Sequence, residues 1–274
     1  MHFTDTYEAV QRVFPEGSFT LTAWKKYAAA ISPELAEKCE KDAADYDFEK
    51  QVLPVLQDAL KNSEGLREIH LSFQRVSKKI ASGFQQAFGQ EPEAEVLLYL
   101  GLCNGAGWAD KLNGKPAVLL GMEKIWELRW GEEEKLFALA AHELGHLYHE
   151  QKGGCFGEAA TLEEEGLFQL YSEGVAMFCE QELLGQPDYY HQDQNGWLTW
   201  CIEQEETLKA EYRRRLAAEE SVQDFFGDWC SYRGKSDTGY FLGCRFVRFL
   251  LERYPLEEML KLKLPALRQA LEEF

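Results

Sequence analysis

Five consecutive residues, His142-Glu143-Leu144-Gly145-His146, combine two imidazoles, which can bind zinc, with a carboxylate, which can activate a zinc-bound water. On an α-helix, residues four apart lie one above the other, so both imidazoles project from one face at a separation that suits a single tetrahedral ion. Glu143 lies at the edge of that face, where its carboxylate can reach a metal-bound water without binding the metal. The pentapeptide therefore predicts a zinc site with Glu143 as general base.

Residues 133–150 must form the helix that positions these side chains. Three glutamates at 132–134 place negative charge in its first turn, and residues 136–141 are strong helix formers that are apolar on nearly every side. Gly153-Gly154 ends the pattern. We expect a buried helix at the floor of a cleft; the alternative is a core helix whose histidines are only hydrogen-bonded.

A second helix, at about residues 162–184, offers a third ligand. Thr161-Leu-Glu-Glu164 is a capping box that opens this helix, and Gly185 followed by Pro187 closes it. Glu173 lies in an apolar stretch, where an unpaired carboxylate is costly to bury and coordination to a cation would compensate. Glu165 and Glu180 compete for this role, and a Glu173 that is solvated or paired with an arginine is the alternative.

The rest of the chain reads as mostly helical, with a small β element. Residues 1–92 form an expected helical N-terminal subdomain, and residues 93–274 an expected catalytic domain, unless both pack as one continuous unit. Apolar runs at 96–103 and 117–121, with a hairpin signal at Asn113-Gly114, predict a small antiparallel β element directly before the first helix. An edge strand there could bind a peptide by strand addition. The predicted fold class is α+β.

Composition limits the function classes. The formal net charge of −18 and pI near 4.8 argue against nucleic-acid or anionic-membrane binding, because phosphate contacts need a basic face. The N-terminus lacks the pattern of a signal peptide and no run of 18 apolar residues occurs, so we expect a cytoplasmic protein. Seven scattered cysteines without a C-x-x-C pair predict small buried side chains rather than disulfides or a zinc ribbon.

The HExxH pentapeptide, followed 27 residues later by Glu173-Gly174-Val175-Ala176, resembles the gluzincin group of zinc metallopeptidases. The resemblance implies a zincin-like core in which His142, His146 and Glu173 bind zinc and Glu143 is the general base. Tyr240-x-x-Gly243, which opens a C-terminal helix, is similar to the segment that carries a substrate-facing tyrosine in several gluzincin families. The likeness covers roughly residues 95–255 and is nearest to bacterial proteins described as predicted zinc-dependent proteases.

Three further positions bear on which zincin class the chain resembles. The metzincin class needs a glycine and a histidine where this chain has His149 and Lys152, so that class is excluded. His149 is then either an orienting or helix C-terminal histidine, or part of a second metal site. Met177 stands where some gluzincins have an aspartate that orients a ligand, which leaves the orienting groups of the two histidines open.

A segment near residue 121 suggests an alternative specificity. Gly121-Met122-Glu123 faintly resembles the signature with which exopeptidases bind a substrate's free amine, although Lys124 follows it. The sequence thus predicts a cytoplasmic peptidase with one zinc ion per chain, acting on peptides or proteins, in which Tyr240 stabilises the oxyanion. The alternatives are a non-catalytic zincin-fold binding or regulatory protein with a structural zinc, and an aminopeptidase.

Overall fold

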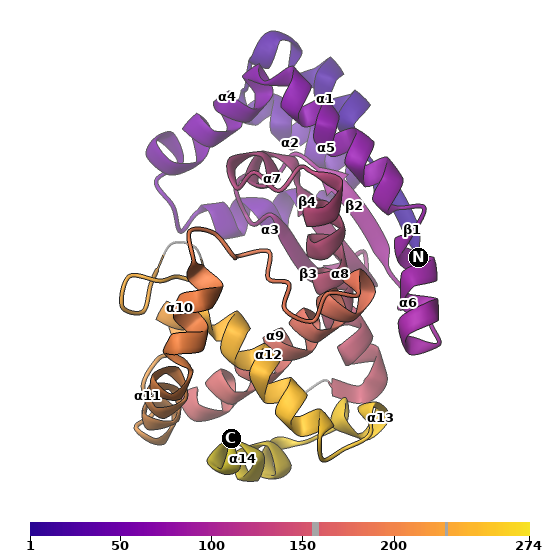
Figure 1. Ribbon diagram of the computed structural model, residues 1–274. Coiled ribbons are helices and arrows are strands. Elements are labelled where there is room, and N and C mark those ends of the chain that lie inside the picture. The colour runs from indigo at the N-terminus through magenta and orange to yellow at the C-terminus, as the bar shows by residue number, and fades with distance from the viewer. Residues whose placement is uncertain (155–158, 228–229) are drawn as a thin grey trace. The chain divides into compact units, whose positions relative to one another are not determined.

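The computed structural model describes residues 1–154, 159–227 and 230–274 (Figure 1). It divides into two units, Met1–Leu147 and Tyr148–Phe274, and the boundary falls inside helix α8 (Glu133–His149), which contains both histidines of the HExxH pattern. This division differs from the expected boundary near residue 92, because the N-terminal helices and the strands belong to the same unit. Whether residues 1–92 fold as a separate subdomain stays a prediction.

The first unit combines a small sheet with the N-terminal helices. Before α8 its elements are β1 (His2–Asp5), α1 (Tyr7–Val13), α2 (Leu21–Ile31), α3 (Pro33–Ala43), α4 (Leu53–Lys61), α5 (Ser63–Val76), α6 (Ile80–Phe88), β2 (Glu95–Tyr99), β3 (Gly107–Leu112), β4 (Lys115–Gly121) and α7 (Met122–Glu127). The predominance of helix and the presence of a small sheet confirm the α+β class. A zincin-like core stays a prediction.

The sheet is mixed, which corrects the expected antiparallel element. Its strand order is β1-β2-β4-β3; β1, β2 and β4 run parallel, and β3 alone is antiparallel to its neighbour. The two apolar runs identified from sequence are indeed strands, but they pair in parallel, Val96 opposite Val118. The Asn113-Gly114 hairpin instead joins β3 to β4. Continuous apolar runs are typical of parallel strands buried on both faces, and the two runs pair in this way although a hairpin signal stands between them.

Strand β1 was not predicted, because residues 1–92 were expected to be helical. It is only four residues long, and it pairs with β2 so that Phe3 lies opposite Val96. A pairing partner some ninety residues away leaves no local pattern in a strand this short. The helices that follow do obey local rules, since Pro33 and Pro54 stand in the first turns of α3 and α4.

The core of the first unit lies between these helices and the sheet. Trp24, Leu35 and Phe73 are almost completely buried, and the Trp24 indole donates a hydrogen bond to the carbonyl of Leu100, 2.9 Å away. Helices α1, α2, α4 and α5 lie together at the top of Figure 1, beyond one end of the strands. This packing anchors the end of β2, from which the chain continues toward β3.

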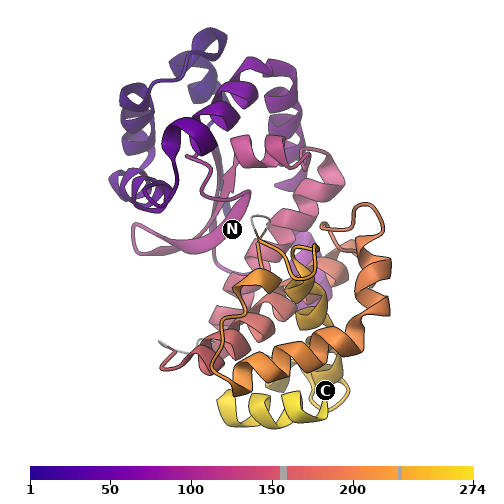
Figure 2. The same cartoon turned by 90° about the vertical axis from the view of Figure 1, so that its left-hand side faces the viewer.

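The second unit is helical. After the end of α8 it contains α9 (Leu162–Leu184), α10 (Trp197–Glu203), α11 (Glu205–Ala217), α12 (Thr238–Leu251), α13 (Leu256–Met259) and α14 (Leu264–Glu273). Figure 2 shows α11 in orange above the yellow α14, and the Lys209 ammonium of α11 lies 4.2 Å from the centre of the Phe274 ring. These helices surround α9 and α12, whose packing on each other dominates this unit.

Helix α9 has the limits that its sequence predicts. Thr161 caps it by accepting a hydrogen bond from the Glu164 backbone N–H at 3.2 Å, and the Glu164 carboxylate accepts one from the backbone of Ala160. The reciprocal bond thus lands one residue before its usual position in a capping box. Gly185 ends the helix in the left-handed conformation.

Among the described residues, no helix is long and apolar enough to cross a membrane. Six described cysteines are free thiols, and most are buried, as expected for small apolar side chains. Cys155 lies outside the described residues.

Candidate metal centre

Helix α8 is buried along the segment that leads to its histidines. Leu136, Ala138 and Ala141 are fully buried, which confirms the expected apolar helix. His142 is 4% exposed, His146 is half-buried, and their ring centroids lie 4.9 Å apart with planes at 83°. The four-residue spacing therefore places the two imidazoles next to each other, as one metal ion requires.

Glu143 lies on the side of α8 that meets the sheet. Glu143 is 7% exposed, and it lies close to Gly107, the first residue of β3. A Cβ atom placed on Gly107 would lie 2.8 Å from both Cγ and Oε1 of Glu143, a distance that side chains do not adopt. Only glycine leaves room for the Glu143 carboxylate at this point.

Glu173 lies on α9 where that helix crosses α12. The following residue, Gly174, packs so closely on α12 that an added Cβ would lie 2.1 Å from the carbonyl oxygen of Gly243. Glu173 itself is half-buried, although the residues from Gly174 to Gln181 are buried. The crossing fixes the turn of α9 that carries Glu173, while the carboxylate keeps access to a ligand.

His142, His146 and Glu173 each offer one ligand atom, and these atoms lie within 4.8 Å of one another. In residues 1–154, 159–227 and 230–274, this is the only group of three histidine, cysteine or acidic side chains that could hold a metal ion. Two imidazole nitrogens and one carboxylate oxygen form a donor set that suits zinc and leaves a fourth position for water. The residues therefore fit the metal that the sequence predicts.

The two competing glutamates have other environments. Glu165 is exposed in the first turns of α9, and Glu180 is fully buried two turns after Glu173. Nδ1 of His191 lies 3.0 Å from both carboxylate oxygens of Glu180. Glu180 is thus within hydrogen-bond distance of His191 and is not a member of the metal group.

Sequence reasoning missed His191. It lies on the loop between α9 and α10, and Tyr189 and Tyr190 next to it are also anchored, the first through a hydrogen bond from the Gln181 amide to its carbonyl at 3.0 Å. The Tyr190 ring packs between Trp197 and Phe241. A loop of this kind has no periodicity, so the only available signal was the isolated Tyr-Tyr-His sequence.

Tyr240, the predicted oxyanion donor, lies in the first turn of α12. It is half-buried, and its ring centroid is 6.4 Å from that of His191 and 5.6 Å from that of Phe226. Leu242 and Phe246, which follow it on the same helix, are buried. The structure thus places Tyr240 one turn before Gly243, at the crossing with α9.

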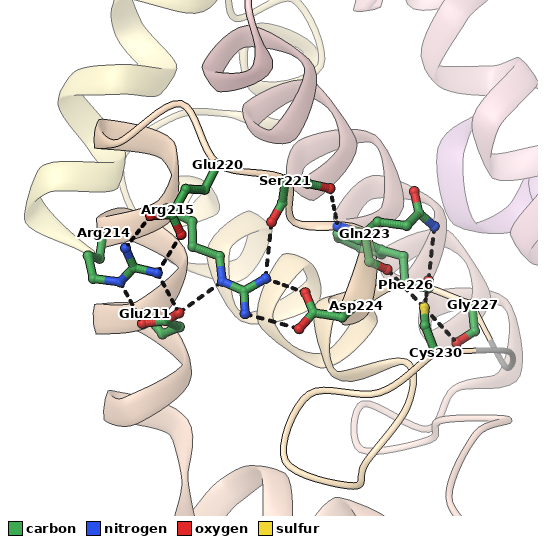
Figure 3. Close-up of polar contacts among 10 residues, drawn as sticks. All are labelled: Glu211, Arg214, Arg215, Glu220, Ser221, Gln223, Asp224, Phe226, Gly227 and Cys230. Carbon is green, nitrogen blue, oxygen red and sulfur yellow. Dashed lines mark hydrogen bonds and ion pairs between the residues drawn. The ribbon is translucent and has the colours of Figure 1, made fainter.

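The segment that supports Tyr240 is held by two arginines of α11 (Figure 3). The Arg214 and Arg215 side chains each donate to the Glu211 carboxylate at 2.9 Å, and these guanidinium groups lower the pKa of Glu211 to about 2. Arg215 also donates to Asp224 at 3.0 Å and lies over the ring of Phe225. This network fixes the chain just before Phe226, which packs against Tyr240.

His149 has a packing role. It is 2% exposed, its ring meets that of Tyr171 edge-on at 4.8 Å, and an added Cβ on Gly154 would lie 2.0 Å from its Cδ2 atom. Among the described residues, His149 belongs to no group that could hold a metal. These contacts favour the interpretation of His149 as a helix C-terminal histidine over a second metal site.

Glu123 belongs to the segment that suggested an aminopeptidase, and its side chain points into the protein interior. Its residue is 0% exposed, and its carboxylate accepts hydrogen bonds from the backbone N–H groups of Gly101 and Cys103. Burial raises the pKa of Glu123 to about 7. A carboxylate in this environment does not present itself to the amine of a substrate.

Comparisons with protein-family models, with curated proteins and with solved structures found no match to this chain.

Proposed function

We propose that the protein is a zinc-dependent peptidase. The observation that carries this proposal is the group formed by His142, His146 and Glu173, whose ligand atoms lie within 4.8 Å of one another. Glu143 stands between the two histidines in sequence and lies close to Gly107, the first residue of β3, where an added Cβ would be 2.8 Å from its carboxylate. A metal site with a carboxylate of this kind beside it is the arrangement that hydrolysis by an activated water needs.

Each protein group has a distinct part in the proposed reaction. His142, His146 and Glu173 would hold the zinc ion, which when bound would supply Lewis acidity and lower the pKa of a water molecule. Glu143 accepts the proton of the attacking water and delivers it to the leaving amine. The Tyr240 hydroxyl donates a hydrogen bond to the carbonyl oxygen as negative charge develops on it.

A peptide is the substrate class that the neighbouring sheet favours. Strand β3 lies at an edge of the sheet in the described part of the chain, and its first residue contacts Glu143. An extended peptide can add to an edge strand through main-chain hydrogen bonds. A peptide added alongside β3 would run past the general base. We therefore propose that the bond cleaved is a peptide bond rather than an ester or another kind of amide.

The buried position of Glu123 weighs against the aminopeptidase alternative. The alternative of a non-catalytic protein with a structural zinc has no specific observation in its favour, and it becomes one outcome of the test below.

The test is the substitution Glu143→Gln, with Glu134→Gln on the exposed part of α8 as the matched control. The amide is nearly isosteric with the carboxylate but cannot accept the proton, so kcat for a peptide library should fall by about 10²- to 10⁴-fold. Zinc content should stay at the wild-type level in both variants. If the wild-type protein binds zinc but cleaves no peptide, the protein is a non-catalytic zinc protein; equal turnover by Glu143→Gln would assign the base to another residue.

A further inference from the structure

The loop between β2 and β3, residues 100–106, is fastened at its first residue. The backbone N–H of Leu100 donates to the Tyr27 hydroxyl at 2.9 Å, and the carbonyl of Leu100 accepts from the Trp24 indole at 2.9 Å. Both aromatic side chains belong to α2 and are buried. The loop therefore starts from a fixed point in the core of the first unit.

Glu123 holds the middle of the loop. Its Oε2 atom accepts a hydrogen bond from the backbone of Gly101 at 2.8 Å, and its Oε1 atom accepts one from Cys103 at 3.0 Å. The Asn104 side chain adds a bond from the backbone of Leu102, at 3.0 Å. Each oxygen of the Glu123 carboxyl group accepts from one N–H group, whereas a glutamine amide has a single acceptor oxygen. A glutamine here could therefore satisfy one of the two N–H groups but not both.

The far end of the loop reaches the general base. The carbonyl of Ala106 accepts a hydrogen bond from the backbone of Gly121 at 3.0 Å, two residues before Glu123. Gly107 follows, and its Cα lies so close to Glu143 that an added Cβ would be 2.8 Å from the carboxylate atom Oε1. The loop is thus held by hydrogen bonds to Glu123 at one part and lies close to the Glu143 side chain at its end.

We propose that Glu123 is a positioning residue for Glu143: it holds the β2–β3 loop, and Gly107 at the end of that loop fixes where the Glu143 carboxylate can lie. The proposal rests on the function proposed above for Glu143. It gives the buried Glu123 a role, because its two oxygens together hold two backbone N–H groups of the loop that ends at Gly107. It also explains why the strand beside Glu143 begins with glycine.

The kinetic test compares Glu123→Gln, Gly107→Ala and the double variant. Each single substitution should lower kcat by about 10- to 100-fold through misplacement of the base, with KM changed by less than about twofold and zinc affinity unchanged. Because both act through the same contact, the effects on kcat should be markedly less than multiplicative in the double variant. Glu127→Gln, on the exposed end of α7, should behave as wild type.

A crystal structure of Glu123→Gln provides a readout that does not depend on activity. We expect residues 101–107 to shift and the Glu143 carboxylate to move with them, while His142 and His146 keep their positions. If Glu143 moves but the wild-type protein hydrolyses nothing, the positioning role stands and the proposed function fails. A Glu123→Gln variant that melts early but keeps the wild-type kcat and Glu143 position would show that Glu123 only anchors the loop, and would overturn the proposal.

Discussion

Residues of the candidate site and its surroundings are connected over very different separations along the chain. The HExxH side chains share one helical face, so their relation is set by a spacing of four residues. Glu123 bonds to backbone groups some twenty residues earlier in the chain, and His191 bonds to Glu180 eleven residues earlier, across a helix end. Neither distance corresponds to a repeat, so pattern analysis gave no reason to connect these residues.

The buried Glu123 carboxyl group leads to a prediction about how the stability of the protein depends on pH. Burial raises the pKa of Glu123 to about 7, and its titratable neighbours include Lys124, whose charge opposes this rise, and the buried Cys39 and Tyr99. Because the pKa of Glu123 is higher in the folded than in the unfolded protein, binding of its proton stabilises the fold. This contribution is fully present below the ordinary carboxyl pKa and is lost as pH rises through about 7. The difference in unfolding free energy between wild type and Glu123→Gln should therefore fall by about 3 kcal/mol between pH 4 and pH 8.

Urea unfolding of the two proteins across this pH range measures that difference. Glu127→Gln is the control, because the Glu127 side chain is 40% exposed on the same helix. A difference between wild type and Glu123→Gln that does not change with pH would mean that Glu123 keeps an ordinary pKa in the folded protein.

A second prediction at the residue scale concerns the role of Tyr240 in turnover. Its ring is fixed between Phe226 and His191, and its proposed hydrogen bond gains most strength in the transition state. Tyr240→Phe should therefore lower kcat by about 10- to 1000-fold with little change in KM. Steady-state kinetics and thermal melts of the variant decide this; a lower melting temperature with normal turnover would make Tyr240 a packing residue and leave the oxyanion to another donor.

At the scale of elements, helices were predicted better than the sheet. The limits of α9 follow from Thr161 and Gly185, which act within the helix itself. The strands were also found, but their pairing was wrong, because an apolar run shows that a strand is buried and does not show which strand lies beside it.

The position of Glu173 depends on how α9 crosses α12. An added Cβ on Gly174 would lie 2.1 Å from the backbone oxygen of Gly243, and a backbone atom cannot move aside as a side chain can. Gly174→Ala should therefore push the helices apart and destabilise the protein by about 1–3 kcal/mol, as overpacked sites do. Urea unfolding checks this, with Gln169→Ala on the half-buried face of α9 as control; equal stability of both variants would contradict the close crossing.

At the scale of the whole molecule, composition and charge set limits but do not identify the function. The net charge of −18 is spread over many carboxylates, and several of these, such as Glu133 and Glu257, have their pKa lowered by lysines or arginines beside them. Such groups stabilise a fold above their ordinary pKa and lose that effect as pH falls. Some of the carboxylates thus belong to surface ion pairs, and the proposed chemistry depends on a few residues of α8, α9 and α12.

The metal content of the purified protein tests the central claim most directly. Elemental analysis should find about one zinc ion per chain in the wild type and in Glu165→Ala, whose carboxylate is exposed. In a chelator competition, Glu173→Ala should lose more than about 100-fold in zinc affinity, beyond what the loss of an orienting group causes. A protein purified without metal whose melting temperature ignores added zinc would contradict the account, and so would a Glu173→Ala variant that binds zinc as tightly as Glu165→Ala.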